Sequence, residues 1–217
     1  MCEFVTKKEL IDPRQVLLDW INDVHYYMRE EYGITFQHLE IGSASRNLVV
    51  QKCNSNYFDL DYQLTIVSWP DDYDINNAKD VKKKFKSAFD ANKPSDFSCC
   101  EDSTQALSSI SKKRGYGMDV IITIYDAEDN FYILRNNKNS NNANNKDYQW
   151  AQKNKYSKLQ DNLRKIRGSK MWNDLRVNYL NKKHQYSKIT DKNNPNYKHS
   201  YQILNESLNE ILNEYGC

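Results

Sequence analysis

The pattern of apolar and polar positions first predicts a helix near the start of the chain. Asp12 can cap a helix, because its side chain can accept a backbone N–H bond, and Pro13 suits the first helical position. Gln15 can complete a capping box, and Gly33 is typical of a helix end. Apolar residues recur between these signals at helical spacing. They are Val16, Leu17, Trp20, Ile21, Val24, Tyr27 and Met28.

Alternation of apolar and polar residues predicts four strands. The clearest of them places Asp59, Asp61, Gln63 and Thr65 on one face and apolar residues on the other. The predicted strands are residues 36–41, 57–67, 118–126 and 131–135, the last two joined as a hairpin by a turn at residues 127–130.

Helical spacing of apolar residues returns in the rest of the chain. The predicted helices are residues 78–91, a shorter one at 104–113, and then 156–166, 172–180 and 201–215. Residues 136–145 are Asn-rich and of low complexity, so we expect a loop there. This order of elements is typical of an α+β fold. We predict a mixed β-sheet core with flanking helices over residues 1–150, and a helical C-terminal part over residues 151–217 that packs on it.

Composition restricts the class of protein. The chain has 217 residues, of which 39% are hydrophobic and 28% charged, as expected of a soluble globular protein. It contains neither a long apolar run that could span a membrane nor an apolar secretory signal at its start. Its five Cys form no Cys-x-x-Cys pair, so neither a zinc ribbon nor a disulfide scaffold is indicated. We expect a cytoplasmic protein with reduced thiols.

Charge is divided unevenly between the two predicted parts. Residues 1–150 carry 18 Lys and Arg against 23 Asp and Glu, a net charge of −5, whereas residues 151–217 carry 13 against 6, a net charge of +7. This asymmetry suggests a site in which carboxylates hold metal and cations hold phosphate. The alternative is an ordinary solvated helical face that is rich in Lys.

Three carboxylates are candidates for a metal site. Asp59 and Asp61 are two residues apart on a strand, so both project from the same face. Adjacent carboxylates repel each other and favour a divalent cation. Asp119 begins another apolar strand, so all three would converge if the two strands pair. A solvated strand face is the alternative for the Asp-x-Asp pair.

The Gly42-Ser43 turn is a candidate for phosphate binding. Gly42 permits a tight strand-to-helix turn and close approach of a ligand to the backbone. The following N–H groups, the Ser43 hydroxyl and a helix N-terminus could hold a phosphate tail, and Arg46 could add positive charge. An isolated Gly-Ser pair is otherwise an ordinary loop.

These pieces together resemble the nucleotidyltransferase superfamily of the DNA polymerase β type, whose signature is hG[GS], then Dh[DE]h, then a third carboxylate on a later strand. The resemblance covers roughly residues 14–135, and the helices that follow are similar to the branch of poly(A) polymerases, oligoadenylate synthases and cyclic GMP-AMP synthase-like bacterial enzymes. The gap between Ser43 and Asp59 is longer than in the minimal antibiotic-modifying members. The matching segments here are Ile41-Gly42-Ser43, Asp59-Leu60-Asp61-Tyr62 and Asp119.

The resemblance implies an enzyme that uses an NTP, such as ATP, and Mg²⁺ or Mn²⁺. Asp59 and Asp61 would bind the metal carried with the NTP, and Asp119 would help to bind a second metal. Gly42 and Ser43 would hold the β- and γ-phosphates. An acceptor hydroxyl would attack the α-phosphate and release pyrophosphate, so that catalysis rests on positioning and charge neutralisation.

The basic C-terminal part is the candidate partner for phosphate. The resemblance implies that a helix there supplies a cation to the triphosphate, and we expect Lys182 or Lys183 to do so. Trp172 and Tyr179 lie at helical spacing and are expected in the core. The same cations could instead contact an RNA acceptor.

Three functional interpretations follow from the sequence. The first is a metal-dependent nucleotidyltransferase, which could make a nucleotide signal. The second is an inactive member of the same fold that binds a nucleotide or RNA, and the third is a structural domain with a coincidental acidic strand. The acceptor could be a second nucleotide, an RNA end, a protein hydroxyl or a small molecule.

Overall fold

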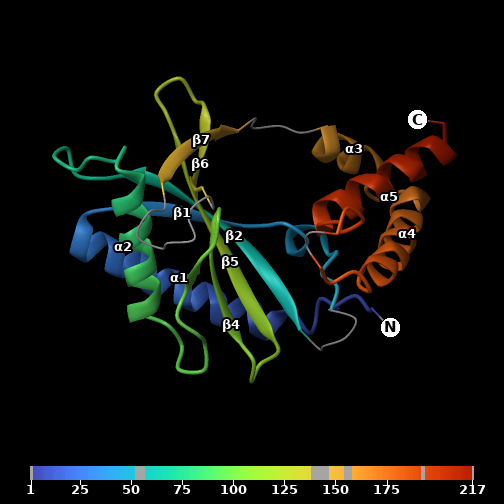
Figure 1. Ribbon diagram of the computed structural model, residues 1–217, viewed down its shortest axis with the longest axis horizontal. Helices are drawn as coiled ribbons and strands as arrows, with labels where there is room; N and C mark the ends of the chain where they lie inside the picture. The colour runs from blue at the N-terminus through green and yellow to red at the C-terminus, as the bar shows by residue number, and fades with distance from the viewer. Residues whose placement is uncertain (1, 52–56, 138–146, 154–157, 192–193, 217) are drawn as a thin grey trace. The chain divides into compact units, whose positions relative to one another are not determined.

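The computed structural model describes residues 2–51, 57–137, 147–153, 158–191 and 194–216 (Figure 1). The chain divides into two compact units. One comprises Thr6–Val49 and Tyr57–Lys155, and we call it the sheet unit. The other comprises Met1–Val5, Val50–Asn56 and Tyr156–Cys217, and we call it the helical unit. This division differs from the predicted boundary at residue 150, because two short N-terminal segments group with the C-terminal helices.

Seven strands of the described residues form one mixed sheet in the sheet unit. The strand order is β1-β2-β5-β4-β3, and β6 pairs with β5 and β7. The pairing of β2 with β5 is parallel and the other pairings are antiparallel. The strands are β1 (Thr35–Ile41), β2 (Phe58–Ser68), β3 (Glu101–Asp102), β4 (Ala106–Ser111), β5 (Tyr116–Tyr125), β6 (Phe131–Asn136) and β7 (Tyr148–Lys153). Together with the helices, this confirms the predicted α+β fold.

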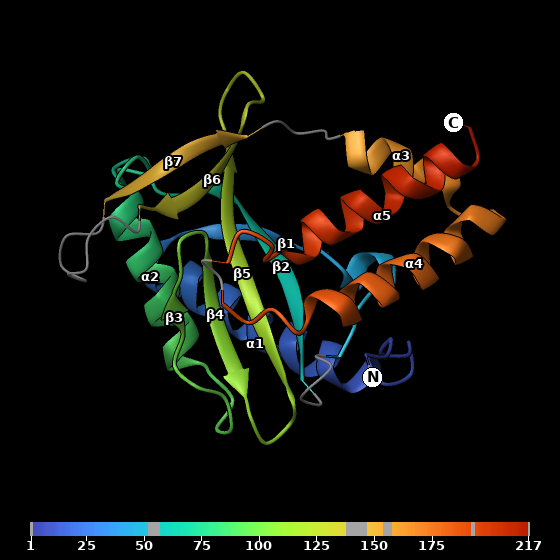
Figure 2. The ribbon, with the colours of Figure 1, turned by 45° about the vertical axis from the view of Figure 1, so that its right-hand side comes forward.

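Two helices, α1 (Ile11–Tyr32) and α2 (Ala78–Ala91), lie against one face of this sheet (Figure 2). Trp20 of α1 meets Phe89 of α2 edge-on with ring centroids 5.5 Å apart, and its indole N–H donates to the Phe89 carbonyl at 3.1 Å. The apolar face of β2 is buried here, as its alternation predicts. The buried residues of that face are Phe58, Leu60, Tyr62, Leu64 and Ile66.

The start of α1 differs from the prediction. Asp12 lies in the first turn of the helix and does not cap it. A reciprocal pair of hydrogen bonds lies upstream instead, where the Thr6 N–H donates to Glu9 at 2.8 Å and the Glu9 N–H donates to the Thr6 hydroxyl at 3.3 Å. The predicted end is confirmed, because Gly33 takes the left-handed conformation, with φ of 64°, that closes a helix.

The helix predicted over residues 104–113 is wrong, because this segment contains strand β4. Its buried positions alternate, and two of the three are Ser109 and Ser111 rather than apolar residues. Ser109 donates to the Ser98 carbonyl at 2.6 Å and Ser111 to Asp96 at 3.0 Å, so hydrogen bonds allow these hydroxyls to be buried. Strand β7 was also not predicted, because its partly exposed residues show little apolar alternation.

A buried charge network joins α2 to the edge strands. The Lys82 side chain is 2% exposed, and its ammonium lies 2.9 Å from Asp102 and donates to the Ser103 carbonyl at 3.0 Å. Asp102 also accepts from the Tyr148 hydroxyl at 2.6 Å and from the Asn136 amide at 3.1 Å. A buried charge is tolerated when it is paired and hydrogen-bonded in this way. The network therefore ties α2, β3, β6 and β7 together.

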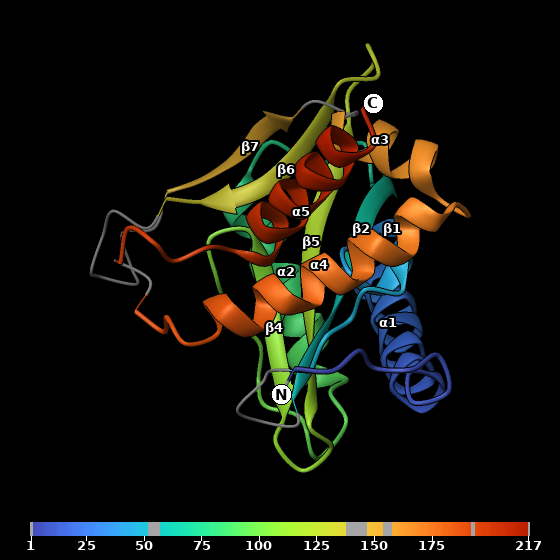
Figure 3. The same ribbon diagram turned by 90° about the vertical axis from the view of Figure 1, so that its right-hand side faces the viewer.

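The helical unit contains α3 (Lys158–Ile166), α4 (Lys170–Tyr186) and α5 (Ser200–Glu214). Helices α4 and α5 lie side by side (Figures 2 and 3), and α3 contacts both. Phe4 and Val50 form an isolated antiparallel bridge, and the Arg176 guanidinium lies 4.1 Å from the centroid of the Phe4 ring. The buried apolar residues of the helices are Leu159, Leu163, Ile166, Leu175, Tyr179, Ile203, Leu204, Leu208 and Ile211.

The described cysteines differ in their chemical state. Cys99 and Cys100 are free thiols, and burial raises the pKa of Cys100 to about 12. Cys2 is disulfide-bonded, so the expectation of reduced thiols is wrong for that residue. Among the described residues, every helix is too short or too polar to cross a lipid bilayer.

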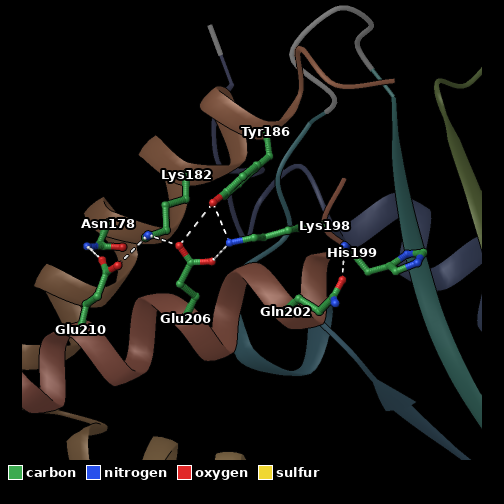
Figure 4. Close-up of polar contacts among 8 residues, drawn as sticks. All are labelled: Asn178, Lys182, Tyr186, Lys198, His199, Gln202, Glu206 and Glu210. Carbon is green, nitrogen blue, oxygen red and sulfur yellow. Dashed lines mark hydrogen bonds and ion pairs between the residues drawn. The ribbon is translucent and has the colours of Figure 1, made fainter. Parts of the chain in front are cut away.

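A cluster of ionic hydrogen bonds joins α4 to α5 (Figure 4). The Lys182 ammonium donates to Glu206 at 2.5 Å and to Glu210 at 2.8 Å. Lys198 bonds to Glu206 as well, and donates to the Tyr186 hydroxyl at 2.7 Å. Burial alone would lower the pKa of Lys182, but its bonds to the two carboxylates outweigh that effect and raise the pKa. The cluster therefore holds Lys182 charged between two helices.

We expect Lys182→Ala to lower the free energy of unfolding by about 1–2 kcal/mol, because two charge-assisted bonds are lost, of which the one to Glu206 is partly buried. Lys183→Ala is the matched control, since Lys183 is the next residue of α4 and donates to the neutral Ser200 hydroxyl at 2.8 Å. That variant should change stability by less than about 0.5 kcal/mol. Urea denaturation of both variants measures the difference, and equal losses would contradict a structural role for the Lys182 cluster.

Candidate active site

The three predicted carboxylates lie on neighbouring strands of one sheet face. In the parallel pairing of β2 with β5, Asp61 lies opposite Asp119 and Asp59 lies opposite Gly117. Directly paired residues of two strands project from the same face, and all three carboxylates are partly exposed, on the face opposite the buried Leu60. Strands β2 and β5 therefore pair, as the sequence analysis required for the three carboxylates to share one face.

The pKa of Asp61 is strongly raised. Burial, the charge of Asp119 and then the charge of Asp59 raise the pKa of Asp61 to about 7. A backbone hydrogen bond from Ser43 and the charge of Arg46 act in the opposite direction but do not cancel the rise. Like charges that are forced together in this way create a place that a divalent cation would stabilise.

The turn after β1 fits closely around Asp61. Gly42 has φ of 66°, in the left-handed region, and a Cβ placed on it would lie 2.1 Å from Oδ2 of Asp61. The space beside Gly42 is thus occupied by the Asp61 carboxylate, so a larger side chain would act on Asp61 before it reached any phosphate. Gly42 is required here both for its backbone conformation and for its missing Cβ.

The helical stretch expected after this turn is very short. A single 3-10 turn, η1 (Ala44–Arg46), follows Gly42 and Ser43. The Arg46 guanidinium folds back to donate to the Gly42 carbonyl at 2.7 Å, and the Ser45 hydroxyl donates to the same oxygen at 3.1 Å. Any phosphate binding at this turn would therefore depend on individual groups, because so short a helix has little dipole.

Arg14 braces the turn from α1, a contact that the sequence did not reveal. Its guanidinium makes a two-point bond to Glu40 of β1, at 2.7 and 2.8 Å, and donates to the Ala44 carbonyl at 3.1 Å. Two parallel bonds fix orientation as well as distance. The end of β1 and the start of η1 are therefore held to the first helix of the sheet unit.

We expect Gly42→Ala to lower the free energy of unfolding by about 1–2 kcal/mol, because an L side chain is strained at this φ. It should also displace the Asp61 carboxylate and weaken binding of Mn²⁺ alone. Gly33→Ala is the control, since Gly33 has φ of 64° but closes α1. Thermal melts with and without Mn²⁺ compare the two variants. Equal stabilisation of both by Mn²⁺ would contradict a link between Gly42 and Asp61.

Tyr57 was not predicted as part of the site. Its hydroxyl donates to Oδ1 of Asp59 at 2.6 Å. Burial raises the pKa of Tyr57 well above its usual range, and the hydrogen bond to Asp59 and the charges of Asp59 and Asp119 raise it further. The only sequence signal was the alternation that places Tyr57 on the face of Asp59.

The same face carries polar groups beyond the carboxylates. Ser108 of β4 lies opposite Asp119, and it was missed because residues 104–113 were predicted to be helical. Further along, the Thr65 and Thr123 hydroxyls are 2.9 Å apart, and the Gln63 amide donates to Thr65 at 3.0 Å. The site is thus one end of a polar surface that crosses β2, β5 and β4.

Comparisons with known proteins identify the fold. No protein-family model matches the sequence, and no curated protein matches it. Solved structures do match. CdnG, a CD-NTase of Bradyrhizobium diazoefficiens in complex with GTP, has a TM-score of 0.58 at 12% identity, over 92% of this chain and 65% of that one. The chain has the fold of a CD-NTase, a cyclic GMP-AMP synthase-like nucleotidyltransferase.

Two further structures support this nucleotidyltransferase fold. The apo form of DncV from Vibrio cholerae has a TM-score of 0.58 at 13% identity, over 96% of this chain and 53% of that one. CdnC of E. coli MS115-1 with ATP has a TM-score of 0.54 at 12% identity, over 96% of this chain and 61% of that one. The chain spans less than two thirds of the length of each of these proteins.

A nucleotidyltransferase fold implies a divalent cation, and the donor set fits one of the Mg²⁺ type. Three or more His, Cys, Asp or Glu side chains do not form a ready metal cluster anywhere in the described residues. Mg²⁺, however, commonly takes only one or two protein carboxylates and completes its shell with water and substrate phosphates. Asp61, with its raised pKa, and Asp59 on the same face match that requirement.

Lys182 and Lys183 belong to the helical unit, whereas the carboxylates belong to the sheet unit. Lys182 is bonded to Glu206 and Glu210, and Lys183 donates to Ser200. Binding of a triphosphate by either lysine stays a prediction. If Lys182 is the one that binds, it would have to exchange its carboxylate partners for phosphate oxygens.

Proposed function

We propose that this chain is a metal-dependent nucleotidyltransferase that transfers a nucleotidyl group from an NTP to a hydroxyl acceptor. The observation that carries the proposal is the parallel register that sets Asp61 opposite Asp119, with Asp59 on the same face. The Gly42 turn, which has no space for a side chain beside Asp61, supports it. The shared fold with proteins crystallised with GTP and ATP supports an NTP as the donor.

The roles of the residues follow from their chemistry. Bound Mg²⁺ or Mn²⁺ would neutralise charge on the triphosphate and on the leaving pyrophosphate. Asp59 and Asp61 would hold the cation that accompanies the NTP. Asp119 would orient the acceptor hydroxyl and accept its proton as the oxygen–phosphorus bond forms and the bond to pyrophosphate breaks. The phosphate tail would lie at Gly42, Ser43 and Arg46.

A second nucleotide is the acceptor that the structural likeness favours. DncV is described as a cyclic AMP-GMP synthase, and one of its structures contains a linear intermediate, pppA(3′,5′)pG. We therefore propose that this chain makes a nucleotide signal, linear or cyclic. We also expect it to act in the cytoplasm, where NTPs and Mg²⁺ are abundant.

Incubation with each labelled NTP, singly and in pairs, in Mg²⁺ or Mn²⁺, tests the proposal. We expect release of pyrophosphate and a new oligonucleotide product, resistant to phosphatase when it is cyclic. Added RNA tests the alternative acceptor, since extension of its 3′ end would move the substrate class to nucleic acid. Nucleotide binding without pyrophosphate release under any condition would reject the enzyme and favour the inactive nucleotide-binding interpretation.

A further inference from the structure

We propose that Tyr57 is a positioning residue for the cation ligand Asp59, an inference that rests on the proposed function. Its hydroxyl donates to one oxygen of the Asp59 carboxylate, Oδ1. The 2.6 Å contact is the length expected of a hydrogen bond between a hydroxyl and a charged carboxylate. Such a bond fixes the rotation of the carboxylate, which a cation ligand needs before the cation arrives.

The position of the Tyr57 hydroxyl depends on the neighbouring strand. A Cβ on Gly117 would lie 2.0 Å from the Tyr57 hydroxyl oxygen and 2.7 Å from the Ser109 carbonyl oxygen. Gly117 is also the residue that pairs with Asp59 in the parallel register. The hydroxyl therefore occupies a space that only glycine leaves open, directly beside the carboxylate it holds.

A neutral donor suits this place better than a charged one. Asp59, Asp61 and Asp119 share one face, and their mutual repulsion is part of what would attract a divalent cation. A Lys or Arg at position 57 would neutralise Asp59 and compete with that cation. A tyrosine hydroxyl orients Asp59 without adding positive charge, much as the backbone bond from Ser43 acts on Asp61.

The experiment compares Tyr57→Phe with the wild-type protein, using Mn²⁺ alone as the probe. Free Mn²⁺ is measured by electron paramagnetic resonance, so no turnover is needed. We expect the affinity to fall about tenfold, as is typical when the hydrogen-bond partner of a metal ligand is lost. Tyr132→Phe is the matched control, because it also deletes a partly buried tyrosine–aspartate bond, from Tyr132 to Asp126 at 3.0 Å, at the turn between β5 and β6.

A double-mutant cycle separates positioning from general stability. In an Asp59→Asn background, Tyr57→Phe should have no further effect on Mn²⁺ affinity, because the ligand through which Tyr57 acts is gone. If Tyr57 only supported the fold, Tyr57→Phe would lower the Mn²⁺ affinity by the same factor in both backgrounds. With an NTP, Tyr57→Phe should raise the Mn²⁺ concentration required for half-maximal rate more than it lowers kcat.

The outcomes distinguish this inference from the function it rests on. If Asp59→Asn weakens Mn²⁺ binding while Tyr57→Phe leaves it unchanged or tighter, the role of Tyr57 is rejected and the metal site stands. If neither variant changes Mn²⁺ binding, the proposed metal site itself fails. Should Tyr57→Phe not fold, wild-type protein with labelled tyrosine takes its place: Mg²⁺ must shift the Tyr57 ring resonance more than that of Tyr132, and equal shifts reject the proposal.

Discussion

Asp119→Asn is expected to lower kcat for pyrophosphate release by about 10²–10³-fold while it changes KM for the NTP by less than about threefold. Asp119 lies opposite Asp61 on the parallel strand, at the place where an acceptor hydroxyl would meet the NTP. Its carboxylate would act mainly as the new bond forms, so its loss should appear in the transition state rather than in NTP binding. Asn keeps the shape of the side chain and removes its charge and basicity.

Steady-state kinetics on a product identified by chromatography measure this effect. Ser108→Ala is the matched control, because Ser108 is the partner of Asp119 on β4 but carries no charge. We expect it to change kcat by less than about tenfold, within the range of a single hydrogen bond to a neutral group. A large rise in KM with unchanged kcat in Asp119→Asn would show that Asp119 binds substrate rather than assists the chemistry.

The sequence predicted best those elements whose buried face is apolar. Strand β2 alternates without interruption from Leu60 to Ile66, and the apolar residues of that pattern are buried while Asp59 and Asp61 stay on the other face. Helix α1 and the three C-terminal helices were found for the same reason, since their apolar stripes face a core. These are the places where local pattern and burial agree.

Strand β4 was missed because its core positions are filled by hydroxyls. Ser109 and Ser111 are buried through bonds to the Ser98 carbonyl and to Asp96, partners that are distant in sequence. A pattern of apolar residues cannot report burial of this kind. The Lys82 network could not be predicted for the same reason. Lys82 is a buried lysine in α2, whose sequence otherwise has the pattern of an ordinary amphipathic helix.

The sequence pointed to the candidate carboxylates but not to the groups that hold them. Asp59, Asp61 and Asp119 stand out by residue type, and the pairing of β2 with β5 is enough to place them on one face of the sheet. The bonds from Tyr57 to Asp59 and from Arg14 to Glu40 depend on how the chain folds around them. The glycines carry some of that information, since Gly42 and Gly117 mark the places where Asp61 and Tyr57 come closest to another strand or turn.

Asp61→Asn is expected to stabilise the protein in the absence of divalent cations, by about 2–4 kcal/mol at pH 8 and by almost nothing near pH 4. Burial and the charges of Asp119 and Asp59 raise the pKa of Asp61 from 3.8 to about 7 in the folded state. Between these two values the folded protein binds a proton that the unfolded chain has released, so its stability falls as pH rises through that window. The stability contributed by this proton is therefore complete below about pH 4 and lost above about pH 7.

Asn resembles the protonated carboxyl at every pH, so the stability of the variant does not fall as pH rises through that window. Thermal and urea unfolding from pH 4 to pH 8 with a chelator measure the difference, and Asp23→Asn on the exposed side of α1 is the control that should show no such pH dependence. At pH 8, Mg²⁺ or Mn²⁺ should make the wild-type protein more stable than Asp61→Asn, because a cation stabilises the charged wild-type carboxylate and not the amide. A wild-type protein as stable as Asp61→Asn at pH 8 without cations would show that the three carboxylates do not strain the fold. A variant that is more stable and inactive would instead show that the protein gives up stability to keep these charges together.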